Sequence, residues 1–254
     1  METINFEIDL KENIYFSIRL IISIIIYSLL VFMLFAAIDS RANRASIITL
    51  YFYAGLILLY FFISLGLLVG YIKGNAIKIT RNQFPEVHAI LERQCERLDI
   101  DVPSAYMLQS GGVLNAFATK FIGRNYVIVY SEIFELAYER GQDALEFVIG
   151  HELGHIKRNH ITKRLFLIPS IIIPFLGSAY SRACEYTCDN IGKALSPNGA
   201  TDGLLILASG KTLYKKVNVE EYINEERNEN SFWKWLSEKV SSHPNLPKRV
   251  NRMR

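Results

Sequence analysis

The chain contains 254 residues, of which 50% are apolar, and it carries a formal net charge of +3. So small a charge does not indicate a nucleic-acid partner, and the sequence contains no phosphate-binding loop, dinucleotide fingerprint or repeat. The mean hydropathy of +0.17 exceeds that of typical soluble proteins and points to a membrane-embedded part.

Two long apolar segments come first in the chain. Residues 14–38 contain one charged side chain, Arg19, and residues 47–72 contain none. Each segment exceeds the length of about 20 apolar residues that crosses a bilayer. We therefore predict two transmembrane helices, forming a hairpin within a membrane anchor of residues 1–75, with Arg19 reaching the lipid–water boundary. A cleaved signal peptide is disfavoured for the first segment, because its leader is acidic and a second span follows.

The basic residues near the ends of these segments predict the orientation of the anchor. Arg41 and Arg44 lie in the connecting loop. Five basic residues flank the opposite ends: Lys11, Arg19, Lys73, Lys78 and Arg81. Because more basic residues flank these ends than lie in the loop, the N-terminus and the catalytic domain are predicted to lie on the cytoplasmic side. An odd number of cysteines, three, is compatible with that reducing compartment.

Residues 76–254 form the second predicted domain, which mixes helices with a small sheet. Pro85 begins a helical pattern that continues to Ile100. Aromatic and β-branched residues then predict three short strands, at residues 104–110, 114–121 and 125–131. The fold class is therefore α+β, with a mostly helical catalytic domain. An edge strand of such a sheet can bind an extended peptide through backbone hydrogen bonds.

The sequence HELGH, residues 151–155, carries the most specific chemical signal. On a helix His151 and His155 are four residues apart and face the same point, with Glu152 beside them. This is the zincin pattern, in which two imidazoles bind zinc and the carboxylate takes a proton from the metal-bound water. Two surface histidines beside an unrelated glutamate are the alternative, which the apolar surroundings of the motif disfavour.

A catalytic zinc needs a third protein ligand, and the sequence around Glu185 supplies a candidate. Glu185 and Asp189 are also four residues apart and share a helix face. We expect Glu185 to bind the metal and Asp189 to accept a hydrogen bond from a ligating imidazole. Cys184 and Cys188 are expected to be packing residues, because a soft fourth ligand would close the open coordination position.

Two apolar segments further along the chain have no clear assignment from the sequence. Residues 165–180 are too short for a double crossing, and a single crossing would separate Glu185 from the histidines. We favour an interfacial or re-entrant insert there over an apolar loop packed on the domain. The aromatic cluster of Phe232, Trp233 and Trp235 fits a small core slightly better than a membrane-interface belt.

The order of the motifs NAFA (115–118), VIVYS (127–131), HELGH, EYTCD (185–189) and HPNLPKR (243–249) resembles that of the membrane-bound zinc metallopeptidases of the HtpX and CAAX prenyl protease family. The resemblance covers roughly residues 84–254, and the two preceding spans also match its bacterial heat-shock proteases. It implies that zinc is bound by His151, His155 and Glu185, that Glu152 is the base, and that Asp189 supports a ligand.

The same resemblance implies that Asn115 and Ala116 lie on the substrate-binding strand and that His243 and Arg249 lie near the site. It also implies a bacterial cell membrane. The heat-shock proteases have two further spans between HELGH and the third ligand, and the 30 positions from His155 to Glu185 do not accommodate them.

The predicted function is hydrolysis of peptide bonds by a membrane-anchored endopeptidase with one Zn²⁺ per chain. The expected partners are a protein or peptide substrate and the lipid bilayer, with no nucleic acid and no prediction of oligomeric state. His160 and Arg182 are candidates for stabilising the oxyanion. The alternatives are a non-catalytic protein with a structural zinc site and a prenyl-protein processing protease. Quality control of membrane or unfolded proteins fits the resemblance best.

Overall fold

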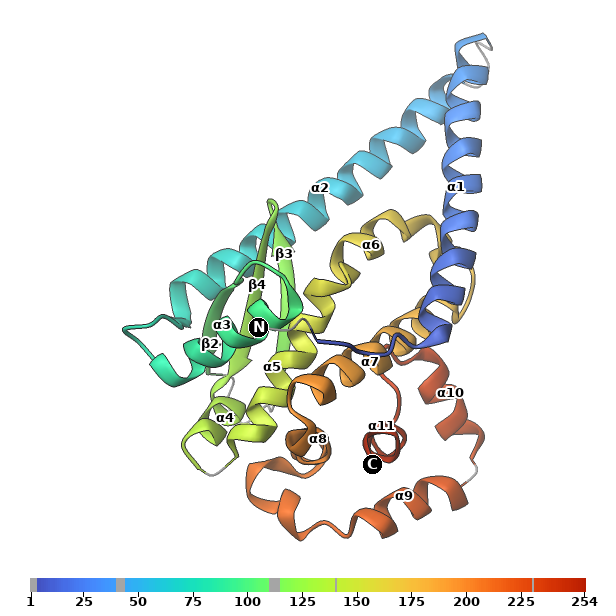
Figure 1. Ribbon diagram of the computed structural model, residues 1–254. Coiled ribbons are helices and arrows are strands. Elements are labelled where there is room, and N and C mark those ends of the chain that lie inside the picture. Colours follow the sequence, from blue (N-terminus) through green and yellow to red (C-terminus); the bar gives the residue numbers. More distant parts are fainter. Residues whose placement is uncertain (1–3, 40–43, 110–114, 140, 230) are drawn as a thin grey trace.

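The computed structural model describes residues 4–39, 44–109, 115–139, 141–229 and 231–254, and it shows two long helices beside a mostly helical domain with one small sheet (Figure 1). The predicted α+β class is confirmed. Predicted strand ends at Ser110 and Leu114, and the loop residue Arg41, lie outside the described residues.

Helices α1 (Leu10–Asp39) and α2 (Arg44–Asn75) are the two predicted membrane helices. Both are long and apolar enough to cross a membrane, and little of either apolar window is buried in the protein. They meet at one end and diverge toward the rest of the molecule (Figure 1). Helix α1 begins earlier than Ile14 because the carboxylate of Asp9 accepts a hydrogen bond from the Lys11 N–H at 2.9 Å.

The side chain of Arg19, which we expected to extend toward the lipid–water boundary, is buried within the protein. Its Nε donates to Ser170 Oγ at 2.8 Å, and its Nη2 donates to the Leu167 carbonyl at 3.0 Å. A charge near an apolar helix is stabilised when such acceptors satisfy it. Arg19 therefore fastens the loop after α6 to α1.

The sheet has four strands in the order β1-β2-β4-β3. Its strands are β1 (Ile77–Lys78), β2 (Ser104–Leu108), β3 (Ala116–Phe121) and β4 (Arg124–Tyr130). Strand β4 pairs in parallel with β2 and antiparallel with β3, so β3 is an edge strand. The three predicted strands are present, whereas the two residues of β1 are too few to leave a periodic signal in the sequence.

Helices α5 (Gln142–Lys157) and α7 (Leu176–Leu195) cross in close contact at the centre of the domain. A Cβ on Gly154 would lie 3.3 Å from Cys188 Cα, and a Cβ on Gly192 would lie 2.9 Å from the Phe147 carbonyl oxygen. Glycine at these two positions therefore lets the helix axes approach closely enough for their side chains to converge.

The remaining helices surround this pair. They are α3 (Pro85–Leu98), α4 (Ser131–Phe134), α6 (His160–Phe166), α8 (Ala200–Leu213), α9 (Val219–Asn228), α10 (Phe232–Val240) and α11 (Leu246–Met253). Short 3-10 turns occupy η1 (Glu135–Ala137), η2 (Ile168–Ile172), η3 (Pro197–Gly199) and η4 (Tyr214–Lys216). The main core lies between α3, α5, α8 and one face of the sheet.

The insert of residues 165–180 contains the end of α6, η2 and the start of α7. Leu167 and Ser170 are buried against α1, but Ile171 and Ile172 are 73% and 67% exposed. The alternative of an apolar loop packed on the domain is therefore wrong for most of these side chains. The preferred core interpretation of the aromatic cluster in α10 is also wrong, because Phe232, Trp233 and Trp235 are exposed.

Candidate metal centre

The three predicted metal ligands converge where α5 crosses α7. His151 Nε2 lies 3.3 Å from Glu185 Oε2, and His155 Nε2 lies 3.4 Å from Glu185 Oε1. A tetrahedral zinc with bonds of about 2.0–2.2 Å separates its ligand atoms by about 3.3–3.5 Å. Each nitrogen–oxygen distance is therefore of the size that shared zinc coordination requires, and the ligand atoms of the three residues all lie within 4.8 Å of one another.

The charges around these atoms also fit a divalent cation. The carboxylates of Glu152, Glu185 and Asp189 are all buried, and the guanidinium of Arg249 is buried with them. With neutral imidazoles, three carboxylates and one guanidinium leave an excess of two negative charges. An unbalanced buried charge is costly, and a divalent cation bound by Glu185 removes the imbalance.

Asp189 connects one ligand to the end of the chain. Its Oδ1 lies 2.9 Å from His151 Nδ1, so it can hold the imidazole with Nε2 directed at Glu185. Arg249 of α11 donates to both oxygens of Asp189, from Nε at 2.8 Å and from Nη2 at 2.7 Å. Burial raises the pKa of Asp189, but the charge and hydrogen bonds of Arg249 outweigh burial and lower it. Asp189 therefore stays ionised beside His151.

The two carboxylates control the protonation of His151 when no metal is bound. Burial lowers the pKa of His151, but hydrogen bonds to Asp189 and Glu185 outweigh burial and raise it to about 10. For Glu185, burial raises the pKa, and hydrogen bonds from His151 and His155 lower it well below the usual value. In the apo protein a proton on His151 therefore partly replaces the positive charge that zinc supplies.

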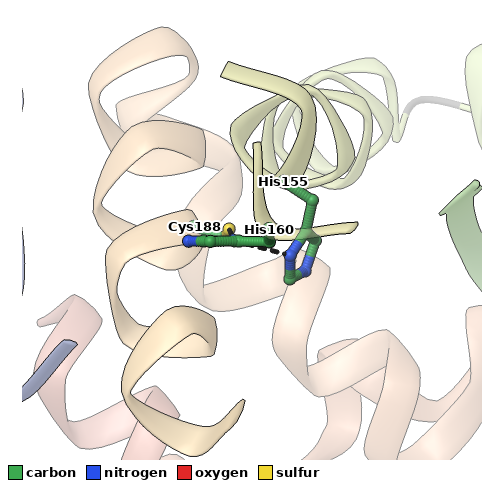
Figure 2. A group of neighbouring side chains, drawn as sticks. All are labelled: His155, His160 and Cys188. Carbon is green, nitrogen blue, oxygen red and sulfur yellow. Dashed lines mark hydrogen bonds between the residues drawn. The ribbon is translucent and has the colours of Figure 1, made fainter. Parts of the chain in front are cut away.

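His155 has a different partner, which is the imidazole of His160 at the start of α6 (Figure 2). The two Nδ1 atoms are 3.0 Å apart, and Cys188 Sγ lies 3.7 Å from His160 Nδ1. His160 is buried, and burial lowers its pKa to about 4. His160 is therefore neutral, and its Nδ1 contacts the ligand His155. The prediction that His160 stabilises the oxyanion is not supported, because its side chain is buried between His155 and Glu12.

The cysteines form two further groups with His160 that have metal-ligand spacing. One group contains His155, His160 and Cys188, and the other contains Glu12, His160 and Cys184. Burial raises the pKa of Cys184 to about 12 and that of Cys188 well above its usual value. Both thiols are protonated in the metal-free protein, so a metal ion at either group would have to displace the proton of a buried thiol. The group of His151, His155 and Glu185 fits zinc better.

A cavity of about 290 Å³ opens onto the three ligands. Glu152, residues 115–118 of the edge strand and its approach, and His243 all contribute to its lining. Because the Tyr130 N–H donates to the Asn115 carbonyl, the strand alternation directs the backbone groups of Ala116 and Ala118 away from β4. The Asn115 side chain accepts from the Ala116 N–H at 2.9 Å. The open edge of β3 thus borders the metal site.

Of the two remaining candidates, His243 lies at the site and Arg182 does not. His243 Nε2 is 3.5 Å from Glu185 Oε1, and its side chain is 61% exposed at the cavity mouth. The Arg182 guanidinium donates to the carbonyls of Glu238, Lys239 and Ser241. Its role as an oxyanion partner is therefore corrected to one of holding the end of α10.

Sequence reasoning missed Glu12, which reaches the back of the site from α1. Its Oε1 lies 3.1 Å from His160 Nε2. Glu12 precedes a membrane span, and nothing in the local sequence indicates its contact with His160, which is 148 positions away. Pairing it with His160 would have needed the three-dimensional docking of α1.

The helix-borne histidines and the glutamate of a crossing helix form the ligand arrangement of the zincin type, and an edge strand borders it. A family model described as Peptidase family M48 matches residues 81–176 and 167–254. This chain belongs to peptidase family M48, which confirms the predicted resemblance to the membrane-bound metallopeptidases of the HtpX and CAAX protease type.

One curated protein is similar to the chain in sequence, and one solved structure is similar to it in fold. Plastoglobule-localized metallopeptidase 48, chloroplastic, of Arabidopsis thaliana is 25% identical over 173 residues, which cover 61% of this chain and 49% of that protein. The chain thus matches about half the length of this curated relative. The crystal structure of S. mikatae Ste24p superposes with a TM-score of 0.51 at 15% identity, covering 98% of this chain and 67% of that one. The latter likeness concerns the fold alone.

Metal uptake is expected to release protons. At pH 7.5 the apo protein carries a proton on His151, whose pKa is about 10, and zinc requires the neutral imidazole. We expect about one proton released per zinc, and an apparent affinity that rises with pH up to about 10. Calorimetric titration in buffers of different ionisation enthalpy measures this number. A binding heat that is independent of the buffer would contradict it.

Proposed function

We propose that the protein is a membrane-anchored, zinc-dependent endopeptidase that hydrolyses peptide bonds of membrane or unfolded proteins. The observation that carries the proposal is the placement of Glu152 in a cavity that also contains the three ligand atoms and an open strand edge. A purely structural zinc site needs four protein ligands and no cavity. The role in quality control rests on the membrane anchor and on recognition through the backbone.

In this mechanism the substrate peptide lies along β3 as an additional strand. The outward N–H and C=O groups of Ala116 and Ala118 bind its backbone, while Asn115 moves off the Ala116 N–H. Such binding is insensitive to substrate side chains. It requires an extended, unfolded segment, which is the state of a misfolded protein or of a loop at the membrane surface.

Glu152 is the proposed base and acid. Bound zinc would lower the pKa of water and polarise the scissile carbonyl. Glu152 takes the proton from the attacking water and delivers it to the leaving amine. His243, at the cavity mouth and 3.5 Å from Glu185, is the side chain placed to donate to the developing oxyanion.

The proposed location of the domain is the membrane surface. The outward-facing Ile171, Ile172 and Phe175 of the insert lie beside α1, where they extend the apolar surface of the anchor. We propose that these side chains enter the bilayer as an interfacial insert. The basic residues at the domain ends of α1 and α2 favour the cytoplasmic side of the membrane. The proposal of a bacterial cell membrane rests on the family resemblance alone.

Replacing the proposed base tests the reaction directly. We expect Glu152→Gln to lose at least about 100-fold in kcat while keeping its zinc, because proton transfer is lost and no ligand is removed. Hydrolysis of an unfolded protein by the detergent-purified enzyme, with zinc quantified in parallel, measures both. Glu146→Gln on the same helix serves as the control and should retain activity. Full zinc content without cleavage in wild type would contradict the proposal.

Proline at the free edge of β3 tests the substrate-binding strand. Because the Ala118 N–H points away from β4, Ala118→Pro removes a donor to substrate without removing one from the sheet. One hydrogen bond contributes about 0.5–1.5 kcal/mol, so kcat/KM should fall about 3–10-fold with zinc content unchanged. The control Ala118→Ser keeps the N–H. Equal kcat/KM for the two variants would exclude pairing at this position.

A further inference from the structure

The first turn of membrane helix α1 delivers a carboxylate to the back of the metal site. Glu12 is 1% exposed, and its Oε1 lies 3.1 Å from His160 Nε2. Arg158, which follows α5, donates to the same oxygen from Nε at 3.1 Å and from Nη2 at 2.8 Å. A carboxylate oxygen with these donors is fixed in position and keeps its charge.

From Glu12 the contacts continue to a metal ligand through one imidazole. His160 Nδ1 is 3.0 Å from His155 Nδ1, and His155 Nε2 faces Glu185. If His155 binds zinc through Nε2, its proton is on Nδ1 and is donated to His160 Nδ1. His160 then carries its own proton on Nε2 and donates it to Glu12. Each imidazole nitrogen along this path therefore acts as a zinc ligand, a hydrogen-bond donor or a hydrogen-bond acceptor, without conflict between neighbours.

The segment that leads into α1 is tied to the helix that carries Glu185. The Asp9 N–H donates to Thr187 Oγ1 at 3.1 Å, and Asn190 Nδ2 donates to the Glu7 carbonyl at 2.9 Å. Arg252 of α11 pairs with the Asp9 carboxylate at 2.8 Å. These contacts hold the start of α1 against α7, so the position of Glu12 relative to His160 is set by the fold.

We propose that Glu12 is a positioning residue of the metal site, acting through His160 to hold His155 with its Nε2 toward the zinc. This inference deepens the proposed function and rests on it for the identity of the ligands. It makes the membrane anchor part of the metal site, so that zinc is bound tightly only when α1 is docked on the catalytic domain. Asp189 performs the corresponding task for His151 from inside the domain.

The expected loss of zinc affinity on replacing Glu12 follows from what is generally observed at protein metal sites. Groups that hydrogen-bond a ligating imidazole typically contribute 10–100-fold in metal affinity. Here the contribution is relayed by one imidazole, and the path has no exposed member between Glu12 and His155. We therefore expect a weakening of zinc binding by about 10-fold when the carboxylate is replaced by an apolar side chain of similar size.

The test measures zinc affinity, because a protease assay alone would not show whether zinc binding had weakened. Wild type, Glu12→Leu, Glu12→Gln and the control Lys11→Gln are purified in detergent as full chains, and the zinc dissociation constant is determined by competition with a chromophoric chelator. We expect about 10-fold weaker binding for Glu12→Leu and a smaller loss for Glu12→Gln, which keeps an acceptor oxygen. Lys11→Gln, whose side chain is exposed, should bind as wild type does.

A double-mutant cycle distinguishes positioning from general destabilisation. If Glu12 acts through His160, Glu12→Leu combined with His160→Leu binds zinc no more weakly than His160→Leu alone. Losses that multiply in the double variant, or affinities of both Glu12 variants within twofold of wild type, overturn the inference. Should Glu12→Leu fail to fold, Glu12→Gln still decides, because unchanged affinity in a folded Glu12→Gln contradicts a role of the charge.

Failure of the proposed function gives a different result from failure of this inference. Wild type that binds zinc but cleaves no unfolded substrate refutes the endopeptidase, and the affinities of the Glu12 variants are still measured. Wild type that cleaves, with unchanged zinc affinity in Glu12→Leu and Glu12→Gln, refutes only the positioning role.

Discussion

The close crossing of α5 and α7 is the constraint on which the metal centre depends. His151 and His155 are one turn apart on α5, and Glu185 must meet both from α7. Glycines at 154 and 192 remove the side chains that would hold the helices apart. The apolar residues of both helices bury this contact, and the energy of that burial holds three ligands and two supporting groups in a fixed arrangement.

Several buried charged side chains around the crossing of α5 and α7 have partners of opposite charge. Arg249 pairs with Asp189 at 2.7 Å and also lies 3.4 Å from Glu185 Oε2, so one guanidinium offsets part of the charge of both carboxylates. Arg249 belongs to the last helix, and Glu12 belongs to the first. Both ends of the chain therefore close on the centre of the domain. The HELGH segment therefore depends on residues that are distant in the sequence. Its buried charged and polar groups need partners, and the fold supplies them from other helices.

Local patterns predicted much of this structure. Two long apolar segments predicted α1 and α2, and alternation with glycine punctuation predicted three strands. Helical spacing predicted that His151 and His155 share one helix face and that Glu185 and Asp189 share another. The errors have a common physical cause. The burial of Arg19, the exposure of Trp233, the contacts of Arg182 and the approach of Glu12 to His160 all depend on how helices dock, and helix periodicity contains no information about docking partners.

We propose that zinc is bound by two imidazoles and the Glu185 carboxylate, and the zinc X-ray absorption spectrum of the purified full chain identifies the bound atoms. Among the residues that the structure describes, three groups of side chains have metal-ligand spacing, and two of them include a cysteine sulfur. We expect the spectrum to show nitrogen and oxygen neighbours alone, at about 2.0–2.2 Å. A sulfur neighbour at about 2.3 Å would place the metal with Cys184 or Cys188 and contradict it.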